Sequence, residues 1–245
     1  MQPVDYNKIS QIYDDVRAGD LALIRCLIQA LPSCPDLRIL DIGCGTGNYT
    51  DLFQKLTQAE VYGVEPSEGM LAKARQKNER ITFKTGLADH IPFEDDFFDF
   101  VYMTDVIHHI PNIEAMFAEI WRVLRSGGMG CIVTQSHRQI EARPIAQYFP
   151  STARVDKERY PDIDEIIEAA QAQGFTRTEG EILSEEPLEL DDSYLELVRK
   201  KGYSMLHLIS DEEYQTGLEA LEQALRNGPV TVQPAGATLV WFTKA

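Results

Sequence analysis

The sequence predicts a doubly wound α/β fold, in which helices cover both faces of a mostly parallel sheet. Short apolar stretches alternate with segments of helical pattern about a dozen residues long, and the first apolar stretch, 38–42, ends in a cluster of glycines. Strands separated by helices of this length are typical of β-α-β units. Right-handed crossovers place such helices on both faces of the sheet, which explains strands that are apolar along nearly their whole length.

The expected elements follow one another along most of the chain. Residues 5–31 have an amphipathic helical pattern. The strands are expected at 38–42, 60–65, 81–86, 98–105, 127–136 and 237–244, with a further strand after the helix at 162–175. The other helices are expected at 46–56, 67–78, 112–124, 191–200 and 210–228. Together these elements predict a seven-stranded, largely parallel sheet.

Residues 137–161 interrupt the alternation. They show no clear period and contain Pro144, Pro150 and Pro161, so we expect a loop-rich insertion there. The insertion begins just after the carboxyl end of a strand, where loops of α/β proteins carry functional residues. We therefore expect residues 137–165 to form a lid over an acceptor site.

Composition and charge exclude several classes of protein. The chain has 39 Asp and Glu but only 23 Lys and Arg. Its net charge of −16 disfavours nucleic acid and anionic membranes as partners. The stretch 21–31 is interrupted by Arg25 and Gln29, so it falls short of a membrane span. The N-terminus lacks the apolar segment of a secretory signal, and the four cysteines form no Cys-x-x-Cys pair. We expect a cytoplasmic protein with reduced thiols and no metal site.

A glycine-rich loop follows the first strand. Gly43, Gly45 and Gly47 stand between a strand and a helix, where a ligand can lie against the backbone. A dinucleotide fingerprint would require its third glycine at position 48, which is Asn48. Asp41 precedes the loop by two residues, and its carboxylate would tolerate a cation better than a diphosphate. The pattern indicates a cationic ligand without phosphate.

A second acid, Glu65, ends the next strand 22 residues after Gly43. That separation is close to the roughly 20 residues at which an acid reaches ribose hydroxyls in such folds. A nucleoside that carries an ammonium and a sulfonium in place of phosphates is S-adenosylmethionine. The loop therefore favours this cofactor over a nicotinamide dinucleotide.

Four stretches carry a resemblance to a known family: 37–50, VEPSEGML at 64–71, 86–110, and EIWRVLRSGGMGCIV at 119–133. Over residues 5–135 the sequence resembles the class I S-adenosylmethionine-dependent methyltransferases, and it is most similar to their small-molecule branch, the methyltransferase type 11 or UbiE-like domains. The resemblance implies a Rossmann-like fold. It also implies one domain with an N-terminal helical cap at 1–33, a cofactor-binding core at 34–136, and cap insertions at 137–165 and 186–228.

The resemblance implies the cofactor site residue by residue. Asp41, Gly43 and Gly45 would surround the methionine part, and Glu65 would take the ribose hydroxyls. Leu87 stands where the family usually has an acid, so either Asp89 contacts the adenine amino group or the backbone of Leu87 and Ala88 holds the adenine. Tyr6 and Tyr13 resemble tyrosines of an N-terminal helix that folds over the cofactor, although ordinary packing explains them equally well. The remaining expected contacts are Cys44, Gly47, Pro66, Ser67, Met70, Thr104 and Arg17.

Methyl transfer from a sulfonium depends on positioning and on exclusion of water, so a catalytic base is not essential. His108 and His109, after the fourth strand, are the candidates if the acceptor must lose a proton, and packing is their alternative role. Asp105 is expected either to contact substrate or to cap the following helical turn.

The insertion supplies the candidate acceptor contacts His137, Arg138, Arg143 and Tyr148. Guanidinium groups suit an anion, and a solvated face is the alternative reading of the arginines. We therefore expect an S-adenosylmethionine-dependent methyltransferase that acts on a small, anionic molecule. The alternatives are a binding protein of the same fold without turnover and a nicotinamide-dependent oxidoreductase.

Overall fold

The computed structural model describes residues 20–32, 36–57 and 59–245, and these form two compact units. The described part of the larger one, which we call the sheet unit, consists of residues 20–134, 163–181 and 239–245 apart from those gaps. The helical unit contains residues 135–162 and 182–238. The two expected insertions lie almost wholly in the helical unit.

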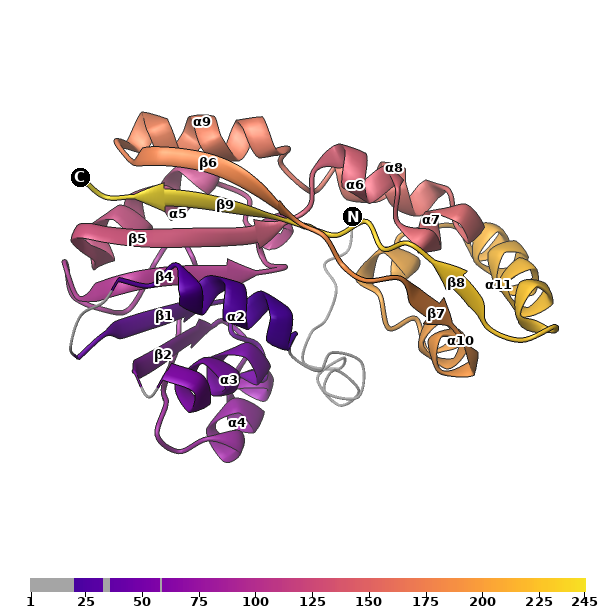
Figure 1. Cartoon of the computed structure of the whole chain (residues 1–245), viewed down its shortest axis with the longest axis horizontal. Coiled ribbons are helices and arrows are strands. Elements are labelled where there is room, and N and C mark those ends of the chain that lie inside the picture. The colour runs from indigo at the N-terminus through magenta and orange to yellow at the C-terminus, as the bar shows by residue number, and fades with distance from the viewer. Residues whose placement is uncertain (1–19, 33–35, 58) are drawn as a thin grey trace. The chain divides into compact units, whose positions relative to one another are not determined.

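The sheet has seven strands in the order β3-β2-β1-β4-β5-β9-β6. Neighbouring strands from β3 to β5 pair in parallel, and Figure 1 shows β9 running opposite to β5. This confirms the predicted seven-stranded, mostly parallel sheet. The strands are β1 Arg38–Ile42, β2 Glu60–Glu65, β3 Thr82–Thr85, β4 Phe98–Thr104, β5 Leu124–Thr134, β6 Thr176–Leu183 and β9 Ala237–Thr243.

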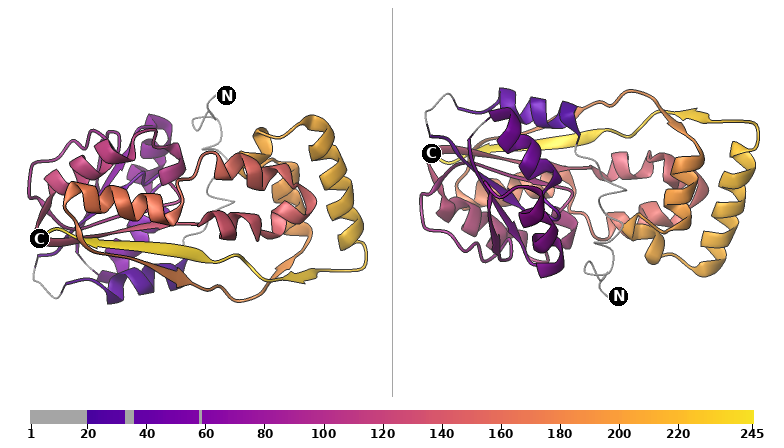
Figure 2. Two further views of the ribbon diagram at one scale, coloured as in Figure 1. Left: turned by 90° about the horizontal axis from the view of Figure 1, so that it is seen from above. Right: turned by 90° about the horizontal axis from the view of Figure 1, so that it is seen from below.

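Helices cover both faces of the sheet, as Figure 2 shows. They are α2 Leu21–Gln29, α3 Asn48–Thr57, α4 Glu68–Lys77, α5 Ile113–Val123 and α9 Ile163–Gln173, with a short 3₁₀ helix η1 at Ile107–His109. Alternate residues of a strand face opposite sides. Val101 of β4 therefore packs in the core beneath α5 and α9, while Tyr102 lies on the other face, its ring centroid 4.7 Å from that of Phe53 on α3.

Polar side chains fix where several helices begin. Asp20 accepts hydrogen bonds from the first turn of α2, the Ser67 hydroxyl accepts one from the Met70 N–H at the start of α4, and Asn112 does the same for α5. Such caps satisfy backbone donors that have no partner inside the helix. The cap of α4 lies close to the end of β2: Ser67 is only two residues after Glu65, the last residue of that strand.

The helical unit has its own apolar core, which includes Phe149, Val198, Leu206 and Leu221. It also contains two short antiparallel strands, β7 and β8, in which Leu188 lies opposite Val232. The elements are α6 His137–Glu141, α7 Pro144–Tyr148, α8 Ser151–Lys157, β7 Leu188–Leu190, α10 Asp192–Arg199, the 3₁₀ helix η2 Ser204–His207, α11 Asp211–Leu225 and β8 Val230–Val232.

The expectation of a loop-rich segment at 137–161 is wrong, because the segment forms the three short helices α6, α7 and α8. Pro144 is the first residue of α7 and Pro150 is the N-cap of α8. Proline is tolerated at a helix start, where its missing N–H would have no partner anyway. Helices of five to seven residues are also too short to show a helical period in the sequence.

Within the described ranges, no helix has both the length and the apolar character to cross a membrane. The same residues bring together no group of three or more His, Cys, Asp or Glu side chains that could hold a metal ion.

Candidate functional site

The glycine loop between β1 and α3 has a backbone conformation that residues other than glycine rarely adopt. Gly43, Gly45 and Gly47 have φ values of +73°, +54° and +78°, in the left-handed region that favours glycine. A Cβ atom at Gly43 would lie only 2.5 Å from a methyl carbon of Val106. The N–H of Gly43 also donates to the Val64 carbonyl at 2.7 Å, which ties the loop to the end of β2.

A hollow opens beside this loop, at the carboxyl ends of β1 and β4. This edge is where open α/β sheets bind ligands. Five of the residues that line the hollow were predicted to contact the cofactor, whereas Thr46, Asn48 and Tyr49 were missed. Their signal was their place in the chain, since Thr46 lies within the loop and Asn48 and Tyr49 begin the helix that follows it. The hollow is lined by Asp41, Gly43, Cys44, Gly45, Thr46, Asn48, Tyr49 and Thr104.

Asp41 is buried at the end of β1, with 1% of its surface exposed. Its Oδ2 accepts hydrogen bonds from the Thr50 hydroxyl at 2.7 Å and from the Tyr102 hydroxyl at 2.9 Å. Burial raises the pKa of Asp41 to about 7, although the two hydroxyls oppose the rise. Asp41 therefore changes charge near neutral pH. Thr50 and Tyr102 were also missed, because a polar residue in a helix or an aromatic one in a strand gives no signal of such a contact.

Glu65 is held rigidly at the end of β2. Its two carboxylate oxygens accept from different backbone N–H groups, Oε2 from Gly45 at 3.2 Å and Oε1 from Ser67 at 2.9 Å. Burial raises its pKa, and the two hydrogen bonds limit the rise. A carboxylate oxygen can accept more than one hydrogen bond. Glu65 therefore retains acceptor capacity for the hydroxyls of a ligand.

A tight turn follows β3. Leu87 and His90 exchange backbone hydrogen bonds, at 3.4 Å from the Leu87 N–H and 3.1 Å from the His90 N–H. The tip of the turn consists of Ala88 and Asp89, and Leu87 is 53% exposed. Because the Leu87 N–H is engaged within the turn, Ala88 and Asp89 are better placed than Leu87 to offer polar groups to a ligand.

Residues 40–132, which contain the loop, both buried carboxylates and this turn, match the protein family described as Methyltransferase domain. This stretch of the chain therefore matches a methyltransferase domain, and the seven-stranded, mostly parallel sheet agrees with the class I fold. The methyl donor of this class is S-adenosylmethionine.

Similar proteins are found among both curated relatives and solved structures. A demethylmenaquinone methyltransferase of Lactiplantibacillus plantarum is 34% identical over 120 residues, which are 45% of this chain and 51% of the relative. A putative methyltransferase from an antibiotic biosynthesis pathway of Anabaena variabilis has a TM-score of 0.72 and 26% identity, with 93% of this chain and 98% of that one covered. Haemonchus contortus phosphoethanolamine N-methyltransferase 2, solved with S-adenosylmethionine, shares the fold at 20% identity and a TM-score of 0.64, covering 99% and 60%.

In eight curated relatives, the aligned part covers between 26% and 72% of the relative's own length. In six of the eight, the chain spans about half of the relative's length or less.

Two of the adenosine-edge residues predicted in the methyltransferase domain have structural roles as well. The Ser67 hydroxyl caps α4 and its N–H holds Glu65, while Met70 is buried. Pro66, between Glu65 and Ser67, is exposed. Gly47 is not among the residues that line the hollow, and a Cβ atom added to it would lie 3.1 Å from the Cβ of Ala74 on α4. The ligand contacts of these four residues remain predictions.

Three predicted site residues, Asp105, His108 and His109, follow β4. Asp105 is exposed, has a left-handed φ of +55°, and its N–H donates to the Val133 carbonyl. The N-cap residue of the next turn, η1, is Val106, and both roles expected for the Asp105 side chain stay predictions. His108 and His109 both lie in η1 with their ring centroids 3.8 Å apart.

The four acceptor contacts predicted in the insertion lie in the helical unit, whereas Asp105 lies in the sheet unit. The His137 ring contacts the Tyr160 carbonyl through Nε2 at 2.8 Å and Asp162 through Nδ1 at 3.5 Å, so both ring nitrogens have partners. Arg138 is exposed on α6. Tyr148 packs at the edge of the unit's core, and Arg143 forms an ion pair described below. Tyr6, Tyr13 and Arg17 lie outside the described residues.

Proposed function

We propose that this protein is an enzyme that transfers a methyl group from S-adenosylmethionine to a small organic acceptor. The observation that carries the proposal is Glu65, a buried carboxylate fixed by two backbone N–H groups, one of them from the glycine loop. A carboxylate in this position suits two adjacent hydroxyls of a ribose.

The residues at the hollow fit this cofactor better than they fit a dinucleotide. The described residues that line it include the buried acid Asp41 and no Lys or Arg. A diphosphate would be repelled by Asp41, whereas an ammonium would be attracted. In this proposal Asp41, Gly43 and Gly45 hold the methionine end, Glu65 holds the ribose, and Ala88 with Asp89 contacts the adenine.

When bound, S-adenosylmethionine supplies a methyl group whose bond to sulfur breaks as the acceptor atom bonds to it, and the electron pair stays on sulfur as a neutral thioether. The chain's residues orient the two reactants and keep water away, which accounts for much of the catalysis in such a displacement. If the acceptor atom carries a proton, His108 or His109 is the group proposed to take it. A carboxylate acceptor needs no base.

We propose further that the acceptor is anionic. The names of the relatives cover demethylmenaquinone and phosphoethanolamine, which differ widely, so the acceptor class has to come from this chain's own residues. In a chain of net charge −16, residues 135–162 contain five Lys and Arg against four Asp and Glu. This excess of positive charge supports an anionic acceptor.

Calorimetric titration tests the cofactor assignment. We expect saturable binding of S-adenosylmethionine and none of NAD; the reverse result would favour the oxidoreductase. Formation of S-adenosylhomocysteine that depends on an added acceptor then separates an enzyme from a binding protein that has lost turnover.

A further inference from the structure

The helical unit contains a cluster in which two arginines share one buried acid. Asp156, on α8, is 1% exposed. One of its carboxylate oxygens accepts a hydrogen bond from Arg143 Nη1, and the other accepts from Arg159 Nη2 at 2.7 Å. The side chains of Arg143 and Arg159 are each 14% exposed. The cluster therefore holds one positive charge in excess, in a place largely shielded from water.

In this cluster two arginines share one acid, whereas another arginine of the protein has two acids to itself. Arg122 in the sheet unit has two acids, Glu119 and Asp95, and also donates to the carbonyls of Ile91 and Phe93. Removing a charge from water is costly unless a partner compensates it. An anion that joined the cluster of Arg143, Asp156 and Arg159 would supply the missing compensation.

The cluster also has hydrogen-bonding capacity left over. Arg159 Nη2 donates to Asp156 and to the Ser204 hydroxyl at 3.2 Å, whereas Arg159 Nε is buried and has no hydrogen-bond partner among the described residues. Arg143 Nε donates to Gln135 at 2.6 Å. A buried donor without a partner costs stability, and such atoms are rare in folded proteins. Arg159 is thus the arginine that most lacks an acceptor.

Aromatic rings lie near Arg143 and beside the residue that contacts Arg159. The Arg143 guanidinium lies 5.3 Å from the centroid of the Tyr160 ring. Tyr203 directly precedes Ser204, the residue that contacts Arg159, and its ring centroid is 6.1 Å from that of Tyr194. Tyr160 is buried, but Tyr194 and Tyr203 are only partly buried, and such rings offer flat apolar surface to the body of a ligand.

We propose that the cluster of Arg143, Asp156 and Arg159 is an anion subsite that binds the carboxylate of a small aromatic acid. Arg159 supplies the main contact, Arg143 adds charge, and Asp156 positions both guanidinium groups. That this acid is the methyl acceptor rests on the proposed function; the binding itself does not.

The test compares phenylacetate with its neutral isostere phenylacetamide on the whole chain, with and without added S-adenosylmethionine. Binding is followed through the ¹⁵N–¹H resonance of Arg159 Nε. We expect a saturable shift with phenylacetate and at least about tenfold weaker binding of the amide, because a hydrogen bond to a charged group is lost. Equal binding of acid and amide, or no saturable binding of the acid, would overturn the subsite.

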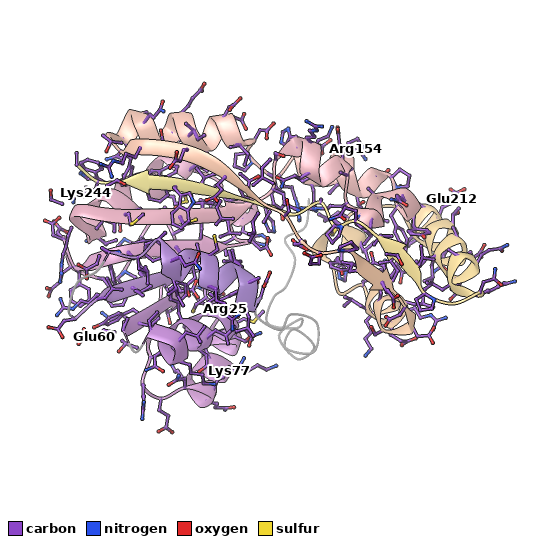
Figure 3. All side chains as sticks on the ribbon, in the orientation of Figure 1. Arg25, Glu60, Lys77, Arg154, Glu212 and Lys244 are labelled. Carbon is purple, nitrogen blue, oxygen red and sulfur yellow. The ribbon has the colours of Figure 1, made fainter. Side chains whose placement is uncertain are left out.

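Arg159→Lys keeps the charge but removes the guanidinium fork, and we expect phenylacetate binding to weaken by about tenfold. Arg154→Lys is the matched control. Arg154, labelled in Figure 3, lies on α8 as Asp156 does, is 66% exposed at its side chain and pairs with Glu158. Equal effects of the two substitutions would contradict the proposal. If Arg159→Lys does not fold, the comparison of acid and amide on the unchanged protein still decides.

The same samples separate this inference from the proposed function. If S-adenosylmethionine binds and phenylacetate does not, the subsite falls and the cofactor assignment stands. If phenylacetate binds and S-adenosylmethionine does not, the subsite stands and the methyltransferase proposal falls.

Discussion

Two buried carboxylates of the sheet unit, Asp41 and Glu65, are stabilised in different ways. Glu65 accepts from two backbone N–H groups, which orient both of its carboxylate oxygens. Asp41 accepts from the hydroxyls of Thr50 and Tyr102, and its burial leaves its charge sensitive to pH near neutrality. In our account Glu65 therefore gives the site its shape, and Asp41 gives it a charge that pH can remove.

Glu65→Ala is expected to weaken binding of S-adenosylmethionine by about 1.5 to 3 kcal/mol, the range for hydrogen bonds to a charged group. Glu60→Ala is the control, since Glu60 begins the same strand with its side chain exposed and paired with Arg38 (Figure 3). Calorimetry and a melting curve would be recorded for both. Equal dissociation constants for the two variants would remove Glu65 from the site.

Cofactor binding should also depend on pH through Asp41. Because its pKa in the free protein is about 7, the ammonium-binding anion is mostly present at pH 8 and mostly protonated at pH 6. The dissociation constant of S-adenosylmethionine should rise by about tenfold between these pH values. Asp41→Asn should bind weakly at both. A wild-type affinity that increased toward pH 6 would have the wrong sign for this role.

At the scale of elements, the loop between β1 and α3 is the part most sensitive to substitution. Gly45→Val is expected to abolish cofactor binding, because a β-branched side chain would fill the space of the ligand. Gly127→Val is the control: Gly127 also has a positive φ, +78°, but a Cβ atom there would meet no atom within 4 Å. Both should lose about 1 to 2 kcal/mol of stability to backbone strain. Normal titration of Gly45→Val would refute the loop assignment.

Several elements could be predicted from the sequence because their signals are local. The strand 38–42 has Ile39, Leu40 and Ile42 just before the glycines, and the structure has it with the same bounds. The strands β7 and β8 were missed because three-residue strands with mostly exposed side chains leave no pattern. The pairing of Arg143 with Asp156 was missed for a different reason, since side chains 13 residues apart meet only through the tertiary packing of short helices.

At the scale of the whole molecule, the two proposed ligands contact residues of different units. Hydrogen exchange tests this assignment. S-adenosylmethionine should protect the amides from Gly43 to Tyr49 and those after Glu65, while phenylacetate should protect α8. The amides of α11 serve as the internal reference. Protection of α8 by S-adenosylmethionine alone, with none in the glycine loop, would reverse the assignment and contradict the site.

The measurement that tests the central claim most directly is release of S-adenosylhomocysteine from the protein, S-adenosylmethionine and fractionated metabolites. An anion exchanger divides a metabolite extract into a retained, anionic fraction and a flow-through of neutral and cationic compounds. We predict acceptor-dependent release with the retained fraction, and less of it from Glu65→Ala when S-adenosylmethionine is not saturating. Release with the flow-through alone would contradict the anionic acceptor. No release with either fraction, from a protein that binds S-adenosylmethionine, would contradict the methyltransferase activity itself.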